Sequence, residues 1–190
     1  MISASFLGRQ EAAIAAQSAV CHALVMAGID VTHMGLKLAK TRKQFNEFRM
    51  GHDMVAHINE TSVPIEVKSS SRSWTGAKEY PSYRPLVCSQ ATADKKGMVH
   101  NGVLGVAHVL ISQPEAERLL GDKKPITGAM LVILPGTEVI ERVPWKDRTR
   151  GEDYFVVQCR RKDLRPFSDL VAHIRYLGGY EGEGKGPDAA

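Results

Sequence analysis

Several features are scarce in this 190-residue sequence, and each scarcity argues against a class of protein. The only cysteines are Cys21, Cys88 and Cys159, which are far apart and form no CxxC pair. Their spacing excludes a disulfide framework or a cysteine-rich zinc site and favours reduced, mostly buried thiols. No apolar run approaches the ~20 residues that cross a bilayer. A glycine-rich phosphate-binding loop is also missing, which argues against a phosphohydrolase acting on small substrates.

The N-terminal stretch "MISASFLGRQEAA" lacks the basic start and long apolar segment of a signal peptide. Together with the cysteine pattern, this predicts a cytoplasmic protein that does not associate with a membrane. A hydrophobic fraction of 43% and a charged fraction of 24% are ordinary for a globular protein. We expect one domain over residues 1–178, large enough to bury a core, and a flexible glycine-rich tail over residues 179–190.

Positive charge is in moderate excess, with a net charge of +4, and it is clustered. The local concentrations are "KLAKTRK" (37–43), "KDRTR" (146–150) and "RRKDLR" (160–165). Such patches are the electrostatic footprint of a nucleic-acid-binding protein. Solvated loops produce the same pattern, so the patches only modify a hypothesis that has another basis.

Residues 9–27 predict the firmest helix, because alanine is abundant and no Gly or Pro interrupts the run. Gly28 is a natural stop at its C-terminus. Apolar residues recur at helical spacing, and we expect this stripe to pack on a sheet. It consists of Leu7, Ile14, Cys21 and Val25.

The remaining pattern predicts a mixed central β-sheet flanked by α-helices, in one α/β layer structure. The run 103–111 is apolar at nearly every position, so a helix and a buried strand fit it equally well. A closing helix is expected within 163–177, starting near Arg165, because Pro166 suits a first turn. The strands are expected at 29–34, 52–58, 63–69, 129–135 and 154–159.

The two strands within "GHDMVAHINETSVPIEVKSSS" (51–71) predict a hairpin. With "NETS" (59–62) as the turn, the expected cross-strand pairs on one face are all apolar: Met54 with Val67, Ala56 with Ile65, and Ile58 with Val63. On the other face Asp53 is expected opposite Lys68 and diagonal to Glu66, about 7–8 Å away. Two carboxylates and an ammonium group therefore converge on one face.

Carboxylate oxygens suit a hard divalent cation, Mg²⁺ or Mn²⁺, and an adjacent lysine can orient an attacking water. This combination suits hydrolysis of a phosphodiester. A plain surface ion-pair cluster is the alternative, and it would contribute ~1 kcal/mol or less. Glu11 lies on the apolar stripe of the first helix and is a candidate fourth group. The helix macrodipole, which favours acidic residues near a helix N-terminus, explains Glu11 equally well.

"GHD" at 51–53 and "IEVK" at 65–68, after a helix that carries Glu11, resemble the core of the PD-(D/E)XK nuclease superfamily. The resemblance covers roughly residues 8–70 and implies a restriction-endonuclease-like fold: a helix, a strand pair bearing the motif, then a further helix and strand. His52 stands where the name-giving proline would be. No "QxxxY" follows Ser70, although Gln90 is a stand-in for a later polar site residue, so the subfamily stays open.

The resemblance implies a role for each motif residue. Asp53 and Glu66 would bind the metal, with the Val67 carbonyl as an extra ligand and Glu11 as the acidic residue of the first helix. Lys68 would activate or position water. The expected activity is metal-dependent cleavage of DNA, and cutting both strands would suggest a symmetric homodimer by analogy.

Flanking residues supply further expectations. Candidate DNA contacts are Ser69, Ser70, Arg72, Arg160 and Arg161. For Trp74 and Tyr80, packing over the core is favoured over stacking on bases. Two other functions stay open: a non-catalytic nucleic-acid-binding or scaffold protein that retains the nuclease fold, and a metal-dependent phosphohydrolase acting on small substrates.

Overall fold

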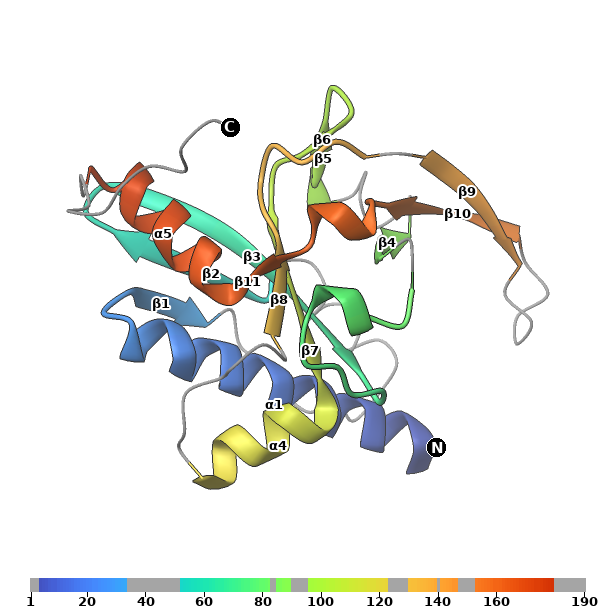
Figure 1. Ribbon diagram of the computed structural model, residues 1–190, viewed down its shortest axis with the longest axis horizontal. Coiled ribbons are helices and arrows are strands. Elements are labelled where there is room, and N and C mark those ends of the chain that lie inside the picture. The colour runs from blue at the N-terminus through green and yellow to red at the C-terminus, as the bar shows by residue number, and fades with distance from the viewer. Residues whose placement is uncertain are drawn as a thin grey trace.

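The protein is an α/β structure in which three helices pack on a mixed six-stranded sheet (Figure 1). This computed structural model describes residues 4–33, 52–82, 85–89, 96–122, 130–139, 141–146 and 153–179. The basic stretches 37–43 and 147–150, Gln90 and the tail from residue 180 onward lie outside these ranges. Within them, no helix combines the length and the apolar character needed to cross a membrane.

The main sheet has a parallel pair at its centre and antiparallel pairs on either side. Strands β3 and β7 are parallel, and every other neighbouring pair is antiparallel. In spatial order the strands are β1 (Asp30–His33), β2 (Met54–Ile58), β3 (Thr61–Ser70), β7 (Ala107–Ser112), β8 (Met130–Ile133) and β11 (Arg165–Pro166). The expected strands of this sheet are therefore confirmed, and the ambiguous run 103–111 forms strand structure.

Smaller elements complete the described chain. A three-stranded sheet has the order β4 (Leu86–Ser89), β10 (Asp153–Gln158) and β9 (Glu141–Lys146). A hairpin joins β5 (Val99–His100) to β6 (Val103–Leu104), and two short 3₁₀ helices are η1 (Ala77–Glu79) and η2 (Arg161–Asp163). Of these, only β10 was expected as an element of its own.

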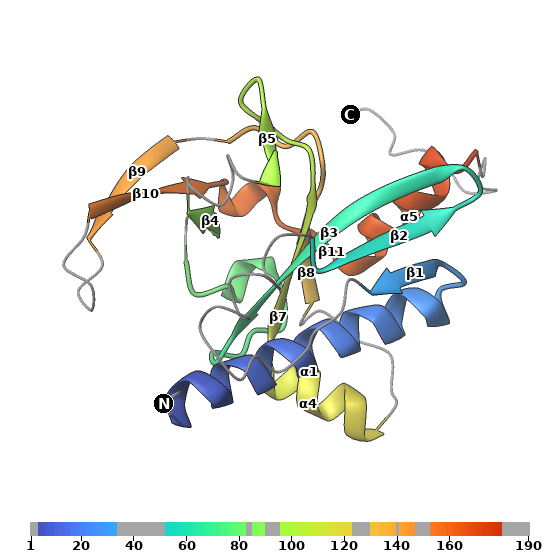
Figure 2. The ribbon, with the colours of Figure 1, turned by 180° about the vertical axis from the view of Figure 1, so that it is seen from behind.

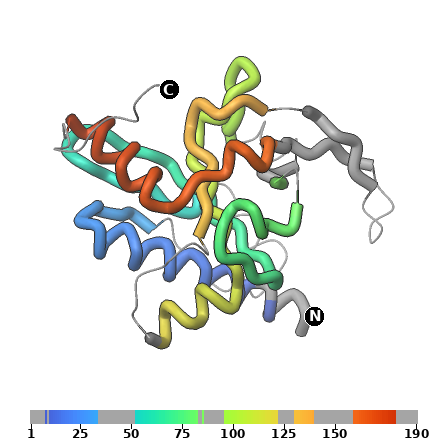
Figure 3. The backbone as a smooth tube through the Cα atoms, viewed as in Figure 1, coloured from blue at the N-terminus to red at the C-terminus, as the bar shows by residue number. Residues whose placement is uncertain are grey.

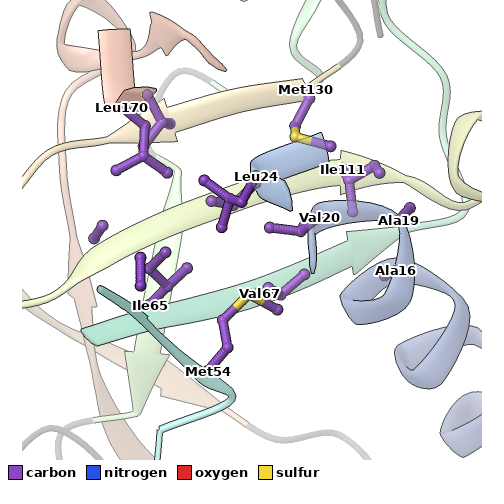
Figure 4. Packing of buried hydrophobic residues seen from close by; sticks show 14 of the residues in the cluster. Ala16, Ala19, Val20, Leu24, Met54, Ile65, Val67, Ile111, Met130 and Leu170 are labelled. Atoms are coloured by element: carbon purple, nitrogen blue, oxygen red, sulfur yellow. The ribbon is translucent and has the colours of Figure 1, made fainter. Parts of the chain in front are cut away.

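All three helices cover the same face of the main sheet. They are α1 (Ala4–Met26), α4 (Gln113–Asp122) and α5 (Phe167–Leu177), and Figure 2 shows them from behind. Figure 4 shows Val20 and Leu24 of α1 lying against Ile65 and Ile111 of the sheet, in one continuous apolar core. Burying each such side chain contributes roughly 1.5–3 kcal/mol, so this layer carries much of the stability.

The opposite face of the sheet is only partly covered by apolar residues. A second core there includes Leu110 of β7 and Ile133 of β8, together with Met98 and the buried Trp74. The Trp74 ring packs edge-on against Tyr80, with ring centroids 5.0 Å apart. Packing over the core, the role favoured for these two aromatic residues, is confirmed.

The first helix is confirmed, but its expected apolar stripe is only partly right, because Cys21 packs against the main core whereas Val25 does not. Val25 is 54% exposed, whereas Ala16, Val20 and Leu24 are buried against the sheet. Alanine covers most of the circumference of this helix, so the hydropathy pattern does not single out one face. The helix begins at Ala4 and ends where expected, with Gly28 at φ 75°.

The hairpin has the expected faces but not the expected register. Met54 pairs with Ile65 and Ala56 with Val63, so every partner differs by two residues from the expectation. The turn is the two-residue Asn59–Glu60 instead of "NETS", and Asn59 adopts φ 50°, which asparagine tolerates well. Because side chains alternate with a period of two, a two-residue shift keeps each residue on its predicted face.

The closing helix docks on this hairpin turn. It begins at Phe167, two residues after the expected start, because Arg165 and Pro166 pair with β8 as strand β11. At its other end, Asn59 Nδ2 donates to the Gly178 carbonyl at 2.5 Å and Thr61 Oγ1 donates to the Leu177 carbonyl at 3.0 Å. Figure 3 shows α5 running alongside the β2–β3 hairpin.

Gly178→Ala should destabilise the protein, because a Cβ at this position would lie 2.5 Å from Ile58 Cγ2. Ile58 is β-branched and cannot swing aside freely, so we expect a loss of about 1–3 kcal/mol in the free energy of unfolding, measured by urea denaturation. Gly8→Ala is the matched control, since a Cβ at that helical position meets nothing within 4 Å. Equal stability of the two variants would contradict the docking of α5 on the turn.

Candidate functional site

The motif residues meet on the sheet face that the helices leave uncovered. Val67, whose side chain points to the other face, is buried against α1 in the main core. Its neighbours Glu66 and Lys68 therefore point away from the helices, because alternate residues of a strand face opposite sides. Asp53 directly precedes β2 and lies beside them. The sequence prediction that these three groups share one face is confirmed.

Asp53 is held by the backbone of the neighbouring strand. The Val67 N–H donates to Asp53 Oδ2 at 2.7 Å. Strand β2 starts only at Met54, so the carboxylate takes the place of a backbone acceptor at the end of the hairpin. Continuing the observed register places Asp53 opposite Glu66, and the expected pairing with Lys68 is wrong.

Glu66 is the most buried charged group of the site, with 1% of the residue exposed. Lys96 Nζ donates to Glu66 Oε1 at 2.5 Å, and Lys68 Nζ donates to Oε2 at 3.4 Å. His52 Nδ1 lies 3.4 Å from Oε1. Positive groups thus face both oxygens of this carboxylate.

The two carboxylates have pKa values shifted in opposite directions. Burial, followed by the charge of Glu66, raises the pKa of Asp53 above its usual value. Burial also acts to raise the pKa of Glu66, but Lys68 and Lys96 together outweigh it and hold that pKa below its usual value. Of the two acids, Asp53 is therefore the one that protonates more easily.

His108 lies beside Glu66 on the adjacent parallel strand, where the two residues are register partners. The imidazole is fully buried, and its Nδ1–H donates to the Val106 carbonyl at 3.1 Å. Nε2 has no hydrogen-bond partner among the described residues. Burial, and then the charge of Lys68, lowers the pKa of His108 to about 4, so the ring is neutral at pH 7.

Asp53 and Glu66 are oxygen donors of the kind that could hold a hard divalent cation. Asp53 and Glu66 supply two carboxylates at adjacent hairpin positions, and Mg²⁺ is commonly held by one or two carboxylates plus waters and phosphate oxygens. The described residues contain no group of three or more Asp, Glu, His or Cys side chains arranged as a complete metal cage. An ion here would therefore complete its coordination with water and substrate.

Glu11 is not brought to this cluster. It is exposed on α1, while its neighbour Gln10 is buried. The expectation that Glu11 points toward the sheet edge is wrong, because it rested on the misassigned helix face. The helix also starts seven residues before Glu11, which places this residue beyond the first turn.

The predicted DNA contacts lie in different surroundings. Ser69 and Arg72 are exposed where β3 ends, and Ser70 Oγ accepts a hydrogen bond from the Arg72 N–H. Arg160 is exposed and lies 3.8 Å from Glu138. The Arg161 guanidinium instead donates to the backbone carbonyls of Ser82 and Tyr80, so it ties η2 to the chain near η1.

Sequence reasoning missed Lys96 and His108. Lys96 is 30 residues from Glu66, within a stretch that carries no periodic signal. His108 gave a weak signal, as a single histidine in an otherwise apolar run. A polar residue in a fully buried strand is usually hydrogen-bonded or placed for function.

Comparison with models of protein families, with curated proteins and with solved structures found no match to this chain.

His108 should make stability depend on pH in the acidic range. The unfolded chain binds a proton near pH 6.5, whereas the folded chain keeps His108 neutral down to about pH 4. The unfolded state thus takes up more protons as the pH falls, and stability should decrease from pH 6.5 to pH 5 by on the order of 2 kcal/mol.

Urea denaturation of the wild type and of His108→Gln at both pH values checks this expectation. Burial also lowers the pKa of His173, so both proteins share that part of the pH dependence. The difference between them isolates His108. An equal loss of stability in both proteins would show that His108 titrates normally in the folded state.

Proposed function

We propose that this protein is a metal-dependent nuclease that hydrolyses DNA phosphodiester bonds, with a restriction-endonuclease-like core. The observation that carries the proposal is the convergence of Asp53, Glu66 and Lys68 on the face of the sheet opposite the helices. Burying two carboxylates next to each other costs stability unless a cation offsets their charge, and such costly arrangements cluster at functional sites. A bound divalent cation would provide that compensation.

The arrangement of elements supports the same proposal. The chain runs from a helix into a hairpin that carries Asp53 and the E-x-K tripeptide, and the E-x-K strand then pairs in parallel with β7. The first helix and the motif-bearing strand pair come in the order that the resemblance implies, whereas the further helix expected before the next strand falls on a connection that the structure describes only in part. The departure is Glu11, whose side chain is exposed.

Each site residue has a distinct role in the proposed reaction. Asp53 and Glu66 would hold Mg²⁺ or Mn²⁺, and the Val67 carbonyl stays a candidate ligand of the same ion. When bound, such an ion polarises a phosphoryl oxygen and lowers the pKa of a coordinated water. Lys68 has a 37% exposed side chain beside Glu66, so its ammonium can orient water and offset charge on the phosphate.

Substrate binding is assigned to the surface around the end of β3. Ser69, Ser70 and Arg72 directly follow the E-x-K tripeptide and can contact phosphates through hydroxyls, backbone amides and a guanidinium. Arg160 adds an exposed cation from another part of the chain. Arg161 is committed to backbone carbonyls and is assigned a structural role instead.

A non-catalytic nucleic-acid-binding protein is the second candidate, and one observation favours it. Lysines contact both oxygens of Glu66, so the cluster is already partly neutralised without a metal. DNA binding that weakens with salt, with no heat of Mn²⁺ binding by calorimetry, would favour this candidate over the nuclease.

Glu66→Gln, Asp53→Asn and Lys68→Met should each reduce Mg²⁺-dependent DNA cleavage by roughly 100-fold or more, since each removes a group that acts on the reacting phosphate or its metal. Cleavage is measured on plasmid and on linear single- and double-stranded DNA. Glu60→Gln, at the exposed hairpin turn, is the matched control and should retain full activity. Persistent cutting by the Glu66→Gln protein would count decisively against the assignment.

A further inference from the structure

Two lysines contact Glu66, and they differ in distance and burial. Lys96 Nζ lies 2.5 Å from Oε1, and the Lys96 side chain is only 9% exposed. Lys68 Nζ lies 3.4 Å from Oε2, and its side chain is 37% exposed. Attraction between opposite charges strengthens as distance and solvent access decrease. Lys96 is therefore the closer and more buried of the two counter-ions of Glu66.

The position of Lys96 is built into the fold. Lys96 immediately precedes Gly97, which adopts φ 61°, and then Met98, which is fully buried in the second core. The Met98 carbonyl accepts a hydrogen bond from the Gly105 N–H at 2.9 Å. Burial of its side chain and the hydrogen bond of its carbonyl both anchor Met98. The Lys96 side chain therefore reaches Glu66 from the segment that links β3 to β7.

We propose that Lys96 is a resident counter-ion of Glu66, which a divalent cation must displace in order to bind. The inference rests on the proposed function, because the cation would bind to the same carboxylate. An ammonium group and a divalent cation repel each other at such short range, so they compete for Glu66 Oε1. Lys96 thereby lowers the affinity of the site for free metal.

Displacement of Lys96 also couples the metal to the substrate. A phosphodiester bound beside the cation offers the displaced Lys96 ammonium a new anionic partner. This contact offsets the loss of its ion pair with Glu66. The metal then binds more tightly in the presence of DNA than alone, and DNA binds more tightly in the presence of metal by the same factor. Lys96 is thus assigned as a positioning residue that links the two binding events.

Calorimetric titration of the metal-free full chain with Mn²⁺ tests the competition directly. We expect Lys96→Met to bind Mn²⁺ about 10-fold more tightly than the wild type, because removing the buried charge frees Glu66 Oε1. Lys96→Arg keeps the charge and should bind like the wild type. Lys78→Met, an exposed lysine of η1, is the matched control and should also be unchanged.

A second arm adds a short DNA duplex with uncleavable phosphorothioate linkages. This duplex should increase the Mn²⁺ affinity of the wild type by a larger factor than that of Lys96→Met. A third arm uses no metal: Lys96→Met should lower the melting temperature, and Glu66→Gln in the same chain should recover most of that loss. If Lys96→Met folds poorly, Lys96→Gln replaces it in all three arms.

The outcomes separate this inference from the proposed function. Equal Mn²⁺ affinity of the wild type and Lys96→Met, with Glu66→Gln abolishing binding, would overturn the counter-ion role and leave the nuclease proposal standing. Absence of Mn²⁺ binding in every variant would overturn the metal-dependent function and the competition together. Tighter binding by Lys96→Met but not by Lys96→Arg would establish the competition.

Discussion

The buried carboxylate of Glu66 is the constraint around which the face of the sheet opposite the helices is organised. A carboxylate that is only 1% exposed loses most of its hydration, and removing the partner of such a group typically costs about 3–5 kcal/mol. Lys96 and Lys68 come from separate parts of the chain to compensate that loss. The segment after β3 must therefore return over the sheet. Trp74 and Met98, both buried in the second core, anchor it there.

The two faces of the sheet carry different kinds of residues. One is covered by three helices and supplies the main apolar core, which makes the hairpin and β7 rigid. The other keeps polar groups near its centre, where Glu66 and His108 are neighbours across the parallel pair. A packed apolar core on one face and buried polar groups on the other form an arrangement suited to a site that holds charged groups at fixed positions.

The hairpin illustrates why some features could be predicted and others could not. Alternation of apolar and polar residues assigned Asp53, Glu66 and Lys68 to one face, and that assignment holds for any register that differs by an even number of residues. The pairing itself depended on whether the turn used two residues or four. Asn59 decided this through its left-handed conformation and its bond to the Gly178 carbonyl, a residue over 100 positions away. The prediction of the buried face of α1 was inaccurate for a related reason, because an alanine-rich helix is apolar around most of its circumference.

By itself the sequence determined the first and last helices, most strands of the main sheet, the alternation along them and the short-range set of Asp53, Glu66 and Lys68, because these follow from periods of two and 3.6 residues. Tertiary structure alone decided that Lys96 faces Glu66, that His108 adjoins it, and that Glu11 points to solvent. Contacts between distant segments depend on how whole layers pack, and packing leaves no local pattern in the chain. The balance of charge at the site is therefore a property of the assembled fold.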